Sequence, residues 1–231
     1  MPLALPDDAA LTPSLVGVEA QAHALAARPR WRAGPPTLLR LLAGLWLFGT
    51  GEGLLVGSRL GNSPWSVLAQ GLSRHTPITV GQATIVISGC VLLLWIPLRQ
   101  WPGLATLSNA LLIGVALDVT LGLLPGGMPP GVRAALIPLG ITSVALGSGL
   151  YLGAHLGPGP RDGLMAGLHR VTGLPIGLVR AAIELTVLAA GWMLGGTVGV
   201  GTVAFALCIG PGVSFALRHP WLRSRASRAV A

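Results

Sequence analysis

The sequence contains no lysine, only two cysteines and few charged residues, and these scarcities exclude several classes of site. All fifteen basic residues of the 231-residue chain are arginine, so a Walker A lysine is absent, and no GxSxG or HExxH motif occurs either. Cys90 and Cys208 form no CxxC pair and no other metal-ligand spacing. We therefore expect no enzyme, no cofactor and no metal site, and we interpret both cysteines as small buried apolar residues.

The composition fits lipid rather than water as the solvent. Charged residues make up 10% of the chain and hydrophobic residues 52%, with a mean hydropathy of +0.73, whereas soluble domains carry about 25% charged residues. A spanning helix needs about 20 mostly apolar residues, and several windows are long enough. The sequence therefore predicts an all-α, polytopic membrane protein with six transmembrane helices, at residues 38–58, 79–98, 104–124, 133–155, 176–195 and 198–217.

The arginines are distributed unevenly between the two sides of these spans. With six crossings, twelve arginines lie on the side of the termini, and three lie on the other side: Arg59, Arg74 and Arg133. Because cytoplasmic loops carry the excess of positive charge, we predict that both termini are cytoplasmic in a bacterial plasma (inner) membrane. The net charge of +8 then reflects anchoring beside an anionic leaflet and not nucleic acid binding.

The second half of the membrane region repeats the first at an offset of 96 residues. Residues 38–124 align with 134–220 without a gap, and 25 of the 87 pairs are identical, among them Arg74 with Arg170. Each copy holds three spans, an odd number, so the sequence predicts two inverted three-helix repeats, as in many transporters. We divide the chain into a cytoplasmic, largely disordered tail (1–37), repeat 1 (38–124), an external linker (125–133), repeat 2 (134–220) and a basic tail (221–231).

Each copy interrupts its apolar sequence in the same way, with LGNSPWSVLA at 60–69 and LGPGPRDGLM at 156–165. Pro64 and Pro160 fit the first turn of a new helix, which predicts short helices over 64–73 and 160–171, about 15–18 Å long. Such a helix either lies in the membrane interface or is re-entrant. A re-entrant helix would enter from opposite faces in the two copies, with its irregular start buried or lining a cavity.

If the short helices are re-entrant, their N-terminal ends would favour a small anionic or zwitterionic solute, because these ends carry partial positive charge. The second copy has Arg161 and Asp162 where the first has Trp65 and Ser66. Compensation of the helix start by Asp162 is the structural alternative to a binding role. The candidate substrate-binding residues are Pro64, Ser66, Gly159, Pro160, Arg161 and Asp162.

Four ionisable residues fall inside the predicted spans, where a charge is costly and normally faces the interior of a bundle. Arg180 and Glu184 are four residues apart on one helical face, so we expect them to neutralise each other. Glu52 and Asp118 have no such local partner. Arg59 is a candidate partner for Glu52, and a proton-coupled role is a further hypothesis for both carboxylates. All four residues are therefore candidate intramembrane charges or coupling sites.

Several stretches together resemble one known family. They are LGNSPWSVLAQGLSRHT, LGPGPRDGLMAGLHRVTG, WIPLRQWPGLATLSNALLIGVALD and GGTVGVGTVAFALCIGP, and they are similar to bacterial YczE/YyaS/YitT-type integral membrane proteins, most closely the YczE branch. The resemblance covers about residues 38–220. It implies a plasma-membrane protein, and it carries over no substrate and no functional residue.

Two functions of different classes follow from these observations. The first is a small-solute permease or transporter with a site at the membrane midplane between the inverted repeats. The second is a non-transporting accessory or regulatory membrane protein that binds a partner through its loops and tails. For partners we expect the lipid bilayer and a small anionic or zwitterionic solute, with a homo-oligomer as an option, and no nucleic acid.

Overall fold

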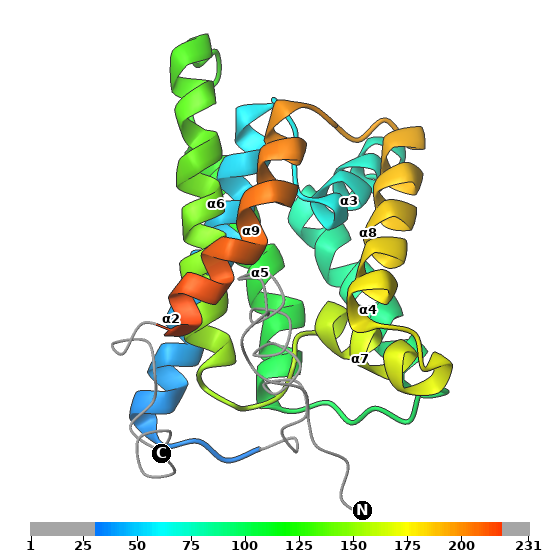
Figure 1. Ribbon diagram of the computed structural model, residues 1–231. Coiled ribbons are helices and arrows are strands. Elements are labelled where there is room, and N and C mark those ends of the chain that lie inside the picture. The colour runs from blue at the N-terminus through cyan, green and yellow to red at the C-terminus, as the bar shows by residue number, and fades with distance from the viewer. Residues whose placement is uncertain (1–30, 219–231) are drawn as a thin grey trace, which may run out of the picture.

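The computed structural model describes residues 31–218, and this part of the chain forms eight helices and no strands (Figure 1). Five helices are long and apolar enough to cross a membrane, and a sixth span results if the bent pair α3 and α4 is counted as one. The predicted all-helical, polytopic membrane protein is confirmed. The helices are α2 (Pro35–Ser58), α3 (Pro64–His75), α4 (Val80–Trp95), α5 (Leu104–Leu123), α6 (Pro130–Leu152), α7 (Pro160–Thr172), α8 (Ile176–Met193) and α9 (Val200–Arg218).

Prolines set several helix boundaries slightly away from the predicted ones. Because proline is preorganised for the first turn, α2 begins at Pro35 and α6 at Pro130, inside the predicted tail and linker. The span predicted at 79–98 is shorter, since α4 ends at Trp95 and the chain turns before Arg99, which has a φ of 50°. Most of the two predicted tails, residues 1–30 and 219–231, lie outside the described residues.

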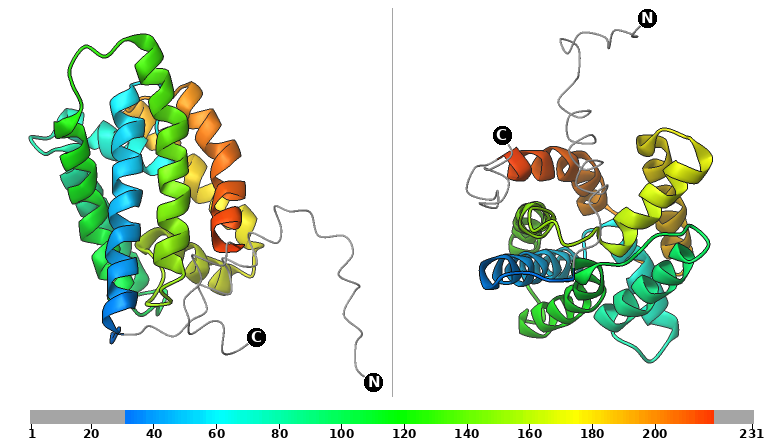
Figure 2. Two further views of the ribbon diagram at one scale, coloured as in Figure 1. Left: turned by 90° about the vertical axis from the view of Figure 1, so that its left-hand side faces the viewer. Right: turned by 90° about the horizontal axis from the view of Figure 1, so that it is seen from below.

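Helices α2 and α6 pack on each other more extensively than any other pair of described helices, and α5 packs against α2 and α9 against α6 (Figure 2). Glycines permit the close approach of α2 and α6. A Cβ atom on Gly44 would lie 2.9 Å from the Gly147 carbonyl oxygen, and one on Gly51 would lie 2.6 Å from that of Gly140. Small residues at helix crossings are the usual basis of packing in membranes, where backbones approach closely.

The two short helices complete the other side of the bundle, toward its opposite ends (Figure 1). Helix α3 packs on α8, and α7 packs on α4. Helix α3 is bent by 113° from α4, so it runs obliquely to the spans. At the other short helix, the buried indole of Trp95 donates a hydrogen bond of 3.0 Å to the Pro160 carbonyl oxygen, which ties the end of α4 to the start of α7.

The outer surface of the bundle carries many large apolar side chains. Cys90 on α4 and Cys208 on α9 are both exposed, so the prediction that they are buried was wrong. The physical reason is that lipid, not water, surrounds the helices. Apolar residues can therefore face outward as well as inward, so an apolar residue type does not predict burial. Helix α8 shows this most clearly, since only 11% of its apolar window is buried.

Candidate functional site

In each of the two broken segments, 60–69 and 156–165, the chain reverses at a glycine that other residue types cannot easily replace. Gly61 and Gly157 have φ values of 120° and 117°, a backbone region that is open chiefly to glycine. Each segment is anchored to the start of a distant helix. The Gly201 amide of α9 donates to the Leu60 carbonyl at 2.9 Å, and the Ala105 amide of α5 donates to the Leu156 carbonyl at 3.1 Å. These bonds fix where α3 and α7 begin.

Both short helices start at one cavity inside the bundle. The cavity offers about 80 Å³ to the centres of water-sized molecules, which is enough for a few waters or one small solute. Every described helix except α4 contributes to its lining, which is unusually polar for the interior of a membrane bundle. The polar and ionisable lining residues are Glu52, Ser63, Trp65, Asn109, Ser148, Tyr151, Arg161, Asp162, Arg180 and Glu184.

Glu52 is the most deeply buried ionisable residue of the cavity, with 0% of its surface exposed. Its Oε2 accepts hydrogen bonds from the hydroxyls of Ser63, at 2.7 Å, and Ser66, at 2.6 Å. The predicted partner, Arg59, does not fill this role. The chain reverses at Arg59, which ends α2 with a φ of 56°, and the reversal brings the first turn of α3 alongside Glu52 instead.

The first turn of α7 contributes opposite charges from adjacent residues. Asp162 accepts a hydrogen bond of 2.6 Å from the Tyr151 hydroxyl, so its carboxylate is held by a side chain of α6. The Arg161 guanidinium lies over the Trp65 ring, 5.1 Å from its centroid, which is a cation–π contact. Residues 65 and 161 correspond to each other at the 96-residue offset, and the structure places them face to face.

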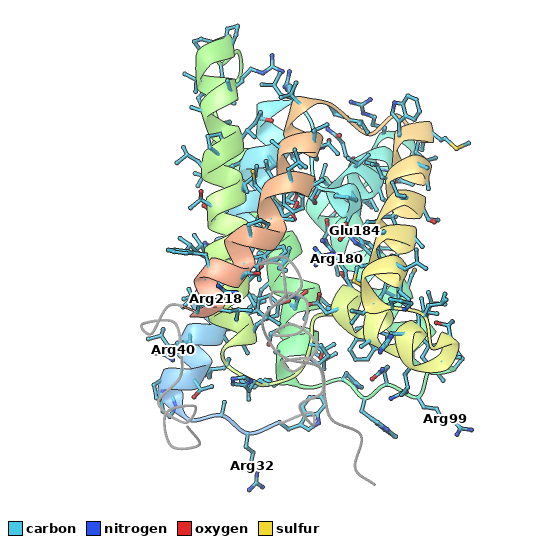
Figure 3. The ribbon with its side chains drawn as sticks, in the orientation of Figure 1. Arg32, Arg40, Arg99, Arg180, Glu184 and Arg218 are labelled. Atoms are coloured by element: carbon cyan, nitrogen blue, oxygen red, sulfur yellow. The ribbon has the colours of Figure 1, made fainter. Side chains whose placement is uncertain are left out.

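Arg180 and Glu184 form the ion pair that their spacing predicts, with 2.9 Å between Arg180 Nε and Glu184 Oε1. Both line the cavity, and Figure 3 shows them projecting from α8 toward the middle of the bundle. The fourth predicted intramembrane charge lies elsewhere. Asp118 accepts hydrogen bonds from the Thr79 hydroxyl and, at 2.8 Å, from the Gly81 amide, so it caps the start of α4 and does not line the cavity.

The remaining predicted binding residues gather at the same place. Pro64 and Gly159 line the cavity directly, Ser66 reaches it through Glu52, and Pro160 contributes its carbonyl oxygen to Trp95. Sequence reasoning missed Tyr151, Asn109, Ser63 and Ser148. Tyr151 had a visible signal, since it is the single tyrosine of the chain and lies in an apolar span. Within residues 31–218, no three histidine, cysteine or acidic side chains converge as metal ligands.

Comparison with known proteins places this chain in a family. The family of unknown function DUF6198 matches residues 36–218. An uncharacterized protein of Haemophilus influenzae is 42% identical over 192 residues, which cover 83% of this chain and 88% of that protein. The uncharacterized membrane protein YczE of Bacillus subtilis is 37% identical over 178 residues, which cover 76% of this chain and 82% of YczE.

A more distant relative extends the comparison. The uncharacterized protein YyaS of Bacillus subtilis is 27% identical over 171 residues, covering 72% of this chain and 85% of YyaS. No solved structure matches the chain. Because the family matches nearly the whole described region, and YczE is itself named a membrane protein, the resemblance seen in the sequence is confirmed. The chain therefore belongs to the DUF6198 family and is a membrane protein similar to YczE and YyaS.

Proposed function

We propose that this protein is a small-solute transporter of the bacterial plasma membrane whose binding site is the cavity between the starts of α3 and α7. The observation that carries the proposal is the convergence of two broken helices on one cavity with five ionisable side chains. Ionisable groups inside a membrane are costly, and they mark pathways for solutes or protons more often than they stabilise a fold.

The packing of α2 on α6 supports the inverted repeat. At the 96-residue offset, Gly44 corresponds to Gly140 and Gly51 to Gly147. The contacts exchange partners accordingly, because Gly44 meets Gly147 and Gly51 meets Gly140. This reciprocity is what a two-fold axis between two copies produces. An axis in the membrane plane is the arrangement that places a binding site at the midplane in many transporters.

The two copies differ at one helix pair, and the difference suggests a route to the cavity. Gly81 of α4 and Gly114 of α5 are so close that a Cβ on either would overlap the carbonyl oxygen of the other. Their counterparts, Gly177 of α8 and Gly210 of α9, would meet no atom within 4 Å. Residues of α8 and α9 line the cavity, so we infer that solutes enter between these helices. Transport would then alternate an open α8–α9 pair with an open α4–α5 pair.

The distribution of arginines supports the predicted orientation, with both termini cytoplasmic. The three arginines assigned to the outside, Arg59, Arg74 and Arg133, lie around one pocket at one end of the bundle. Arg99 and Arg170, assigned to the inside, lie around another pocket. With this orientation, Gly177 near the start of α8 lies in the cytoplasmic half, and we infer that solutes enter between α8 and α9 from the cytoplasm.

Cysteine accessibility tests the proposal. In a protein without Cys90 and Cys208, single cysteines would replace Ser63 or Ser148, two cavity residues of nearly the same size as cysteine. We expect a membrane-impermeant thiol reagent to label both from the cytoplasmic side, in inside-out membrane vesicles. The matched control keeps Cys208 alone, a lipid-facing thiol on α9. Labelling of both cavity positions no faster than Cys208 would contradict a solvated path and favour the accessory-protein alternative.

A further inference from the structure

Two charged groups of the cavity keep hydrogen-bonding capacity that the described residues do not use. One is the second carboxylate oxygen of Glu52, Oε1, which is buried and has no hydrogen-bond partner. The other is the Arg161 guanidinium, which donates no hydrogen bond to any described residue and is held by its contact with the Trp65 ring. The other three charges are engaged, because Asp162 is bound by Tyr151 and Arg180 is paired with Glu184.

The unpaired Oε1 of Glu52 would be stabilised by a hydrogen-bond donor from a ligand. Both serine hydroxyls of the first turn of α3 bind the other oxygen, Oε2, so the carboxylate is oriented with Oε1 left over. An unpaired acceptor on a fully buried carboxylate is expensive, and a charged N–H donor relieves the cost most effectively. A quaternary ammonium lacks that hydrogen and leaves the oxygen unpaired.

The side of the cavity around Arg161 would be stabilised by a hydrogen-bond acceptor from a ligand. A guanidinium presents five N–H donors in a fork that matches a carboxylate. Next to it, the Trp65 indole Nε1 is also buried without a hydrogen-bond partner, with 6% of the residue exposed. The N-terminal ends of α3 and α7 add partial positive charge at the same place. An anionic group would satisfy the guanidinium and the indole together.

From these two unused groups we infer that the cavity binds a small zwitterion that carries a primary ammonium and a carboxylate or similar anion, such as a small amino acid. The inference rests on the proposed transport function and names its substrate class. Glu52 accepts from the ammonium, and Arg161 with Trp65 donates to the anion. Glu52 is an acidic group within electrostatic range of Arg161, yet the two form no ion pair. A lone cation would leave Arg161 unpaired, and a lone anion would face Glu52.

Thermal unfolding of the purified full-length protein tests the inference with defined probes. The zwitterions are glycine, alanine, β-alanine and taurine, the matched single charges are ethylammonium and propionate, and glycine betaine is the zwitterion without an N–H donor. We expect at least one of the four zwitterions to raise the unfolding temperature in a saturable manner. Ethylammonium, propionate and glycine betaine should act at least about tenfold more weakly. Ethylammonium leaves Arg161 without an anion, propionate leaves Glu52 without a cation, and glycine betaine leaves Glu52 Oε1 without an N–H donor.

Two variants assign the contacts. Glu52→Gln keeps the oxygen that Ser63 and Ser66 bind but removes the charge at the Oε1 position, and Arg161→Gln removes the guanidinium. Each should weaken zwitterion binding by about tenfold or more. The control is Gly89→Leu, at an exposed position of α4 where an added Cβ would meet nothing within 4 Å. Leucine is the residue at the equivalent position of α8, Leu185. This variant should bind zwitterions normally.

The results separate the two proposals. Stabilisation by none of the four zwitterions, equal stabilisation by ethylammonium or propionate, or undiminished binding by Glu52→Gln would overturn the zwitterion inference. None of these results affects the cysteine labelling of the cavity, which tests the transport proposal by itself. If Arg161→Gln does not fold, the comparison of alanine with ethylammonium in the unmodified protein still decides whether the anionic group is required.

Discussion

At the scale of single residues, the cavity is asymmetric because the two copies carry different residues at corresponding positions. Glu52 of repeat 1 corresponds to Ser148 of repeat 2, and Ser66 corresponds to Asp162. Each copy therefore supplies a carboxylate from a different element, α2 in one and α7 in the other, and each carboxylate is held by hydroxyl groups. The proposed inverted repeat would thus carry an asymmetric site, which suits the proposed zwitterion, whose two ends differ.

The hydroxyl of Ser66 should contribute measurably to stability. Ser66→Ala removes a 2.6 Å hydrogen bond to a fully buried carboxylate, and hydrogen bonds to charged groups contribute about 1.5–3 kcal/mol. We expect a loss of this size in the free energy of unfolding, seen as a lower unfolding temperature in detergent. Ser73→Ala is the control, because its hydroxyl donates only to the Gln70 carbonyl of its own helix. Equal effects of the two substitutions would contradict the role given to Ser66.

Local spacing explains which of these residue pairs the sequence could predict. Arg180 and Glu184 are four residues apart on one helix, so their ion pair follows from helical geometry alone. Glu52 and its serines are eleven and fourteen residues apart and are joined by a chain reversal at Arg59. Asp118 lies 39 residues from Thr79. Such contacts depend on how helices pack, which periodicity does not specify.

At the scale of helices, the helix-breaking prolines and glycines predicted the bounds of the short helices to within two residues. The sequence predicted 64–73 and 160–171, and the structure has Pro64–His75 and Pro160–Thr172. The sequence left open whether these helices lie in the interface or enter the membrane. Their starts are buried inside the bundle while Arg74 and His75, at the end of α3, are not. Burial of the starts results from packing on α8 and α4, which only the tertiary structure reveals.

The paired glycines of the two copies should respond differently to the same substitution. Gly81→Ala places a Cβ against the Gly114 carbonyl oxygen, so it should cost about 1–3 kcal/mol of stability or prevent folding. Gly177→Ala meets nothing within 4 Å and should change stability by no more than about 1 kcal/mol, favourably if at all. Unfolding temperatures of the two variants, measured side by side, check this contrast. A similar loss in both would mean that α8 and α9 are packed as tightly as α4 and α5.

At the scale of the whole molecule, the two halves are interlocked rather than placed side by side. Helix α3 of the first half packs on α8 of the second, and α7 of the second packs on α4 of the first. The sequence predicted six spans, and the structure has five helices long and apolar enough to cross a membrane, or six if the bent pair α3 and α4 is counted as one. The sequence did not indicate that each short helix is covered by the opposite half, since no local pattern records the partner of a buried helix face.

Interlocking predicts that neither half is stable alone and that the two assemble when expressed together. A break between Gly126 and Gly127 falls in the connection between α5 and α6, where an added Cβ would meet nothing within 4 Å. Fragments 1–126 and 127–231, tagged separately, should co-purify as one species by size-exclusion chromatography, while either fragment alone aggregates. Each fragment alone exposes the faces that the other covers, which include the α2 face packed by α6 and the α4 face packed by α7.

The interface between the fragments can be tested with a matched pair of substitutions in the assembly. Gly147→Leu introduces a side chain against Gly44 and Phe48, where a Cβ would already lie 2.6 Å from backbone atoms of both residues, so it should abolish co-purification. Gly210→Leu lies on the same fragment, where a Cβ meets no atom within 4 Å, and should leave assembly intact. Stable, monodisperse purification of either fragment alone would show that the halves fold independently. The cavity, lined by residues from both fragments, would then be an interface between two finished units and not part of one core.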